Sequence, residues 1–203
     1  MTRDILNNNL LKMRRFFILI LVVGWLIPIG GQGQSYSHIE YENLSNLSSA
    51  KWFGPQINIL GTNLKKDATW GTYFFALLNP GWGQAYGGIL YRPADWVIFR
   101  AGAGLETDSL PWRVNLTSMM FLNRFTFLQI YEYGGSGFWY NIILNYAVTP
   151  QFQAGAILKR FYGLGLNLEY QLPRTPITLN LAPLYDFEFG ESKLMFIFRY
   201  AFL

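Results

Sequence analysis

The chain of 203 residues contains no cysteine and a single histidine, His38. Without cysteine it can form no disulfide, no thiolate metal site, no cysteine nucleophile and no lipid-bearing cysteine of a lipoprotein. One histidine alone also argues against a transition-metal centre. Charged residues are scarce as well, at 14% of the chain. We therefore expect neither a metal nor a cofactor.

Long apolar helices are also missing from most of the chain. Beyond residue 33, no stretch approaches the roughly 18 apolar residues that a membrane-spanning helix needs. Nevertheless, 51% of the residues are hydrophobic and 18% are aromatic, which is high for a soluble domain. These apolar residues are interleaved with Asn, Gln, Thr and Gly. The pattern therefore points to a membrane protein built from strands.

The net charge of +4 gives little reason to expect a nucleic-acid partner. Residues 1–33 carry three of these four net positive charges, which leaves +1 on the rest of the chain. A nucleic-acid-binding surface needs a concentrated excess of Lys and Arg. We therefore expect no nucleic acid among the partners.

The N-terminal residues 1–33 have the pattern of a secretory signal peptide. Three basic residues precede an apolar run, residues 16–29, and a glycine-rich patch follows. This order of charge, apolar centre and small residues predicts cleavage after Gly33. A retained membrane anchor is the alternative, but Pro28 would interrupt a spanning helix. Translation could start at Met1 or at Met13, which opens a more conventional signal.

The mature chain divides into two parts. Residues 34–50 are polar and without a period, so we interpret them as a linker or a short plug. Residues 51–203 alternate in segments of about ten residues, which predicts an all-β, antiparallel, up-and-down transmembrane β-barrel. Nine clear segments begin after residue 84, and two weaker ones, residues 52–62 and 69–78, compete to supply one more. Ten strands are favoured, because the count should be even if both termini are periplasmic, and eight or twelve are the alternatives.

The apolar faces of these strands favour lipid over a soluble core. They belong to nearly every strand, and the short N-terminal segment is too small to cover them. In addition, Tyr140 and Tyr146 bracket two aliphatic residues, and Tyr162 and Tyr170 bracket three leucines. Tyrosines at both limits of an apolar band are typical of membrane interfaces. We therefore expect an outer-membrane location in a Gram-negative cell, with outer-membrane lipids as partners.

Charged residues fall on the face that does not contact lipid. A lipid-facing Arg or Lys at the bilayer midplane costs about 2–4 kcal/mol, so this placement predicts a charged lumen. The candidate cluster consists of Arg100, Arg113, Glu169, Asp186, Glu188, Lys193 and Arg199. It is either an ion-pair network that fills a narrow barrel or the lining of a channel for small solutes. A last hairpin closed by Gly190 and Glu191 would make Glu188 and Lys193 cross-strand partners.

The final strand carries a resemblance to known barrels. From Leu194 to Phe202 its alternate aromatic residues resemble the C-terminal signal that the barrel-assembly machinery reads, although Leu203 follows the last aromatic residue. The resemblance implies that machinery as a partner. With the signal peptide and the strand pattern, nearly the whole chain resembles the small barrels of the outer-membrane protein A and X type. Such a resemblance implies a fold and no particular activity.

These observations favour a non-enzymatic barrel that acts as a structural component, a narrow pore or a platform for a partner. The alternative is an outer-membrane lipid-modifying enzyme, which would use a histidine with a serine and an acidic residue. His38 lies in the expected linker, so we can assemble no such trio. A glycine-rich stretch, residues 79–86, resembles a PG-x-GQ-x-Y element of bacterial membrane proteins of unknown function. Its ordinary interpretation is a tight bend before a strand, and the strand pattern disfavours an inner-membrane protein.

Overall fold

The computed structural model describes residues 34–49 and 51–202 and contains twelve β-strands. The signal-peptide prediction lies outside these residues. No helix in the described ranges is long and apolar enough to cross a membrane. The strands are β1 (Gln34–Asn46), β2 (Lys51–Leu64), β3 (Trp70–Leu78), β4 (Gly83–Ala94), β5 (Val97–Glu106), β6 (Trp112–Leu122), β7 (Phe125–Gly134), β8 (Gly137–Ala147), β9 (Phe152–Lys159), β10 (Gly163–Gln171), β11 (Ile177–Asp186) and β12 (Glu191–Phe202).

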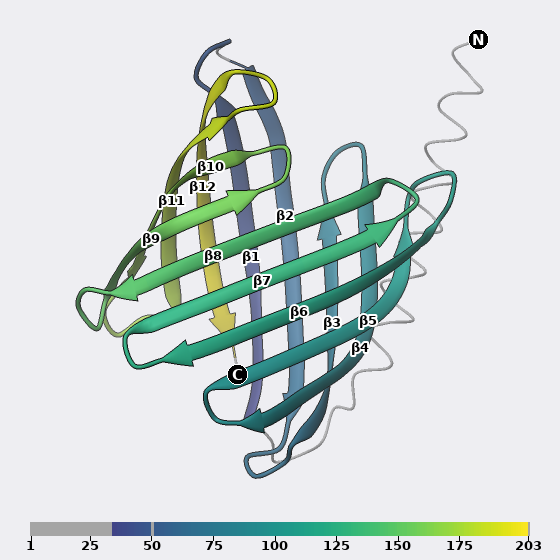
Figure 1. The fold of residues 1–203 in the computed structure, drawn as a ribbon, viewed down its shortest axis with the longest axis vertical. Coiled ribbons are helices and arrows are strands. Elements are labelled where there is room, and N and C mark those ends of the chain that lie inside the picture. Colours follow the sequence, from purple (N-terminus) through teal and green to yellow (C-terminus); the bar gives the residue numbers. More distant parts are fainter. Residues whose placement is uncertain (1–33, 50, 203) are drawn as a thin grey trace.

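The strands form one closed antiparallel barrel with up-and-down topology (Figure 1). Each strand pairs with its neighbour in sequence, and β1 closes the sheet against β12, where Ser37 lies opposite Phe202. The connections contain only two to five residues. We call the end that holds Gln34 and Phe202 the terminus end, and the opposite end, which holds the β3–β4 and β11–β12 turns, the far end.

Alternation along the strands confirms the inside-out arrangement. In β6, exposed Trp112, Val114 and Leu116 alternate with buried Arg113, Asn115 and Thr117. Leu116 is 55% exposed on the outer wall, whereas Arg113 is only 2% exposed inside the barrel. A soluble domain would place these two kinds of side chain the other way round. The outer wall is therefore suited to lipid, as the period-two pattern predicts.

The prediction of ten strands is wrong, because three segments join the nine clear ones. Both weaker segments form full strands, β2 and β3. The expected linker or plug is also a strand: residues 34–46 form β1, which hydrogen-bonds to β2 on one side and to β12 on the other. Its outward residues, Ile39 and Tyr41, are too few to give a strong apolar pattern. The need to satisfy the backbone groups of two edge strands in lipid explains why this polar segment pairs.

Aromatic side chains form a belt near each end of the outer wall. At the terminus end, the rings of Phe125 and Tyr146 lie 5.0 Å apart, and Trp70 and Tyr91 lie 4.3 Å apart. At the far end, Trp112 lies 5.5 Å from the ring of Tyr133, and Tyr185 packs against the next turn. Such belts are typical of the two membrane–water interfaces.

Candidate functional site in the barrel lumen

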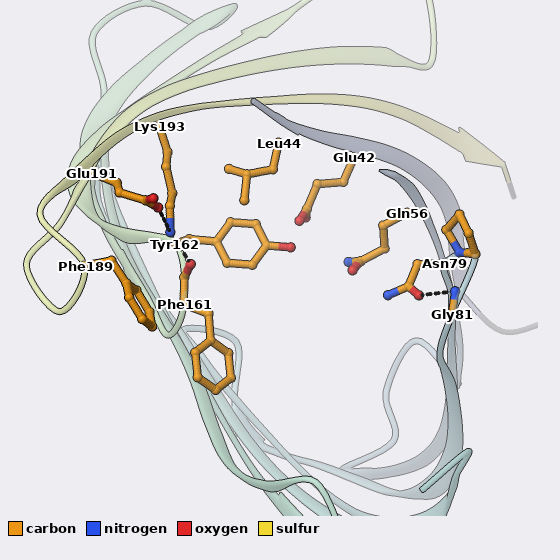
Figure 2. Close-up of a pocket in the computed structure, with 11 residues that line it drawn as sticks. Glu42, Leu44, Gln56, Asn79, Gly81, Phe161, Tyr162, Phe189, Glu191 and Lys193 are labelled. Carbon is orange, nitrogen blue, oxygen red and sulfur yellow. Dashed lines mark hydrogen bonds and ion pairs between the residues drawn. The ribbon is translucent and has the colours of Figure 1, made fainter. Parts of the chain in front are cut away.

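A cavity of about 620 Å³ lies at the far end of the barrel (Figure 2). Strands β1, β2 and β12 and the three turns after β3, β9 and β11 supply its walls. Its lining combines carboxylates, amides and aromatic rings: Glu42, Leu44, Gln56, Asn79, Pro80, Gly81, Phe161, Tyr162, Phe189, Glu191 and Lys193. We call this cavity the vestibule.

An ion pair crosses the lumen at the inner limit of the vestibule. The Lys159 ammonium group at the end of β9 donates to both carboxylate oxygens of Glu42 on β1, at 2.7 and 2.8 Å. Three strands, β10 to β12, separate β9 from β1 in the sheet. Both side chains are buried. The Lys159 nitrogen also lies 3.9 Å from the centre of the Tyr162 ring, which stabilises its charge.

Tyr162 owes its position to the tight turn between β9 and β10. Gly163 follows it with a φ of 114°, and a Cβ added there would clash with the backbone of Tyr185. Glycine is needed at such a positive φ. The sequence pattern places Tyr162 in the outer aromatic belt, and this prediction is wrong, because the side chain points into the vestibule toward Glu42 (Figure 2).

Apolar side chains fill the lumen around the ion pair. Leu44, Ile157, Ala182, Leu184 and Met195 form a buried cluster on the inner wall of β1, β9, β11 and β12. The sulfur of Met195 lies 3.9 Å from the Lys159 nitrogen, which places this cluster beside the pair. An apolar layer of this kind offers water no hydrogen-bond partners and favours a dry constriction.

The opposite half of the lumen is filled by a network centred on Arg113. Its guanidinium group binds Glu106 at 2.6 Å and Glu132 at 2.8 Å. Glu132 also accepts hydrogen bonds from the Gln84 amide at 3.1 Å and the Tyr86 hydroxyl at 2.8 Å. Buried charges are stable only when they are paired and hydrogen-bonded in this way. The network therefore covers the inner wall from β4 to β7 near the far end.

Three asparagines connect the inner walls of β8, β10 and β11. Asn167 donates to Asn145 at 2.8 Å and accepts from Asn180 at 2.7 Å. Asn167 is only 1% exposed. Together with the apolar cluster, this ladder buries much of the inner wall between the vestibule and the terminus end.

The charged side chains of the lumen are more exposed toward the terminus end. There Arg199 binds Glu40 at 2.6 Å and Glu169 at 3.6 Å, and His38 lies 3.5 Å from Glu40. The side chain of Arg199 is 26% exposed, whereas Glu42 in the middle is 3% exposed. The lumen is thus accessible at both ends and closed between them.

Most of the charged residues that the sequence predicts face the lumen, but they lie in separate groups. Arg113, Asp186 and Lys193 are buried in the lumen. Glu169 and Arg199 meet at the terminus end, and Arg100 lies over the ring of Tyr73 at 5.8 Å. Glu188 is the exception, because it is exposed in the turn between β11 and β12.

The predicted pairing of Glu188 with Lys193 is therefore wrong. Lys193 binds Asp186 at 2.6 Å and donates to the carbonyl oxygen of Phe161 at 2.9 Å. The last turn contains four residues, 187–190, and Gly190 closes it with a φ of 67°. The sequence predicts a shorter turn of two residues, Gly190 and Glu191. Such a turn would shift the register between β11 and β12 and place Glu188 opposite Lys193.

Five charged residues of the lumen were missed by the sequence reasoning: Glu40, Glu42, Glu106, Glu132 and Lys159. The first two lie in the segment interpreted as a linker, where their alternation with Ile39 and Tyr41 could have revealed a strand. With Glu191, the inward-facing groups of the described chain comprise seven carboxylates and five cations.

Metal binding and lipid modification find no support in this lumen. No group of three or more His, Asp or Glu residues in the described ranges could hold a metal ion. His38 lies on β1 rather than in a linker, and its side chain faces the lumen beside Glu40. A lipid substrate would approach from the outer wall, so this histidine is badly placed to act on one.

Among comparisons with known proteins, the one with solved structures supports the fold. No protein-family model and no curated protein matches the chain. Among solved structures, KdgM porin in complex with disordered oligogalacturonate is similar, with a TM-score of 0.54 and 13% identity over 82% of this chain and 99% of that one. KdgM porin alone gives a TM-score of 0.53 at the same identity and coverage. A Rhodopseudomonas blastica porin is more distant, with a TM-score of 0.38.

These likenesses correct the resemblance drawn from the sequence. They support an outer-membrane β-barrel but not the specific pattern of the outer-membrane protein A and X type. The closed barrel of twelve antiparallel strands is thus similar in fold to KdgM porin. The chain is an outer-membrane β-barrel of twelve antiparallel strands, similar in fold to KdgM porin.

Proposed function

We propose that the protein is a non-enzymatic, narrow outer-membrane pore whose lumen is closed at rest in the middle. The ion pair between Lys159 and Glu42 carries this proposal, because it crosses the lumen between β9 and β1 at the inner limit of the vestibule. The terminus end around the partly exposed Arg199 supplies the second opening. The fold of the KdgM porins supports a channel over an enzyme.

The closure can open without rearranging the sheet. Lys159 is the last residue of β9, and its long side chain can turn toward the far end while the strands stay paired. Separated partners would each draw water into the constriction, because a buried, unpaired charge costs several kcal/mol. Hydration of the constriction would then connect the two accessible ends.

The charge of the lumen favours small cations and neutral polar solutes over anions. Seven carboxylates face five cations among the inward groups described above. A narrow lumen of low dielectric strengthens the effect of such an excess. Oligogalacturonate, the ligand present in the KdgM complex, is a chain of sugar units that each carry a carboxylate. Because an excess of carboxylates in the lumen repels such a polyanion, we propose a different solute class for this protein.

Conductance across planar bilayers tests the pore. We expect the wild-type protein to show little steady conductance with rare, brief openings. Glu42→Gln leaves Lys159 buried without a carboxylate, and we expect its open probability to rise at least about tenfold, which corresponds to 1.4 kcal/mol. Adding Lys159→Met removes the unpaired charge and should restore the closed state. Glu169→Gln is the matched control, because it removes the same charge outside the constriction.

Absence of conductance from all four proteins would refute the pore, provided that each migrates on an unboiled gel as a folded barrel. The barrel would then be a structural component or a platform for a partner. Large and stable openings of the wild type would instead refute the closure at rest.

A further inference from the structure

An apolar groove of about 320 Å³ lies on the outer wall near the terminus end. Its lining comes from the last residues of β6, the first of β7 and the facing part of β8: Met120, Leu122, Phe125, Phe127 and Leu144. Met120 lies opposite Phe127 in the ladder, and Phe127 lies opposite Leu144. These three residues mark the end of the groove that points toward the middle of the membrane.

The other end of the groove is polar. Arg124 occupies the two-residue turn between Leu122 and Phe125, and its guanidinium group donates to the Tyr146 hydroxyl at 3.4 Å. The Tyr146 ring packs against Phe125 at 5.0 Å. A cation and a phenol therefore lie at the membrane interface, directly beside the apolar groove that runs toward the middle of the membrane.

We propose that this groove binds one anionic phospholipid from the leaflet at the terminus end. Its acyl chain lies along the apolar lining, and its phosphate accepts hydrogen bonds from Arg124 and Tyr146. Guanidinium groups bind phosphate through two parallel hydrogen bonds. The lipid thus matches the groove in both chemistry and direction. This inference does not depend on the proposed pore.

The turns around this end of the barrel favour an anionic headgroup. They contain four cations against two carboxylates: Lys65, Lys66, Arg124 and Arg174 against Asp67 and Asp95. Basic residues next to a membrane surface attract anionic lipids. The excess of basic residues therefore raises the local concentration of anionic lipids. The groove beside Arg124 then binds one of these lipids.

A second copy of the barrel fits the groove less well than a lipid does. Its own apolar wall would cover the Arg124 guanidinium and bring no carboxylate to the outer face of β6 to β8. Covering a cation without a partner is costly. A phosphate neutralises the same group, so a lipid is the occupant that the charge favours.

Native mass spectrometry of the folded barrel in detergent tests this site. The probes are phosphatidylglycerol and phosphatidylcholine with identical acyl chains. We expect one tightly bound phosphatidylglycerol, and weaker binding of phosphatidylcholine. Arg124→Gln should weaken phosphatidylglycerol binding at least about tenfold, because it removes the charge-assisted hydrogen bonds to the phosphate. Met120→Trp should fill the groove and weaken both lipids.

Arg174→Gln is the matched control, because it removes the same charge from another turn at the same end. We expect phosphatidylglycerol binding to change less than twofold in this variant, consistent with additivity of distant sites. Equal weakening by Arg174→Gln and Arg124→Gln would overturn the site in favour of a diffuse basic rim. Equal affinity for the two lipids would also overturn it. Dimers that Met120→Trp abolishes would show that the groove is an interface between copies.

Discussion

Asp186 and Lys193 provide a sharp test of the register at the far end of the lumen. Asp186→Asn removes the negative charge 2.6 Å from the Lys193 ammonium group, and both side chains are buried. Removing one partner of a buried pair costs about 3–5 kcal/mol. Glu191 remains 3.6 Å from Lys193 and compensates part of its charge. We therefore expect a loss near the lower limit, about 3 kcal/mol.

The double variant Asp186→Asn with Lys193→Met should recover most of this loss, because it leaves no unpaired charge. Glu188→Gln is the matched control, since Glu188 is exposed in the turn. It should change the free energy of unfolding by less than about 0.5 kcal/mol. The measurement is urea unfolding in lipid vesicles, followed by tryptophan fluorescence, which the six Trp residues after Gly33 make strong. An equal loss in Asp186→Asn and Glu188→Gln would refute the register.

Three other predictions concern the lipid-facing outer wall, the close pairing of β8 and β9, and the export signal. Leu166→Arg places a cation in lipid on a side chain that is 57% exposed, so refolding into vesicles should cost about 2–4 kcal/mol, whereas Leu166→Met should refold normally. Gly155→Ala puts a Cβ 1.9 Å from a backbone oxygen of β8 and should impair refolding, whereas Gly81→Ala meets nothing within 4 Å and should not. N-terminal sequencing of the envelope form should begin at or near Gln34, and a mature chain that retains Trp25 would contradict the predicted cleavage.

The alternation of apolar and polar residues predicts which side chains face lipid wherever a strand has many apolar outward residues. In β10, the exposed leucines at 164 and 166 and the buried Asn167 have the facing that the sequence indicates. Among residues 37–46 of β1, only Ile39 and Tyr41 are exposed apolar residues, so the local pattern is weak. This strand exists because the edges of β2 and β12 must be paired. Closure of the sheet is a property of the whole chain and cannot be deduced from one segment.

The sequence predicts which charged residues face the lumen, but it does not predict which residues form ion pairs with one another. Lys159 and Glu42 are 117 residues apart, and the tilt of the strands decides that they meet. Likewise, the choice between Asp186 and Glu188 as the partner of Lys193 depends on the length of one turn. The sequence therefore predicts a charged lumen, whereas its closure becomes visible only in the folded barrel.

Cysteine accessibility tests most directly whether the middle of the lumen is closed. The chain has no cysteine, so each introduced thiol reports one position. Ala182 is 0% exposed in the apolar cluster, Glu191 lies in the vestibule, and Glu169 lies toward the terminus end. With a charged, membrane-impermeant thiol reagent, we expect Glu191→Cys and Glu169→Cys to react rapidly and Ala182→Cys to remain unmodified. Adding Glu42→Gln should make Ala182→Cys reactive. Rapid modification of Ala182→Cys in the otherwise wild-type barrel would contradict the closed lumen.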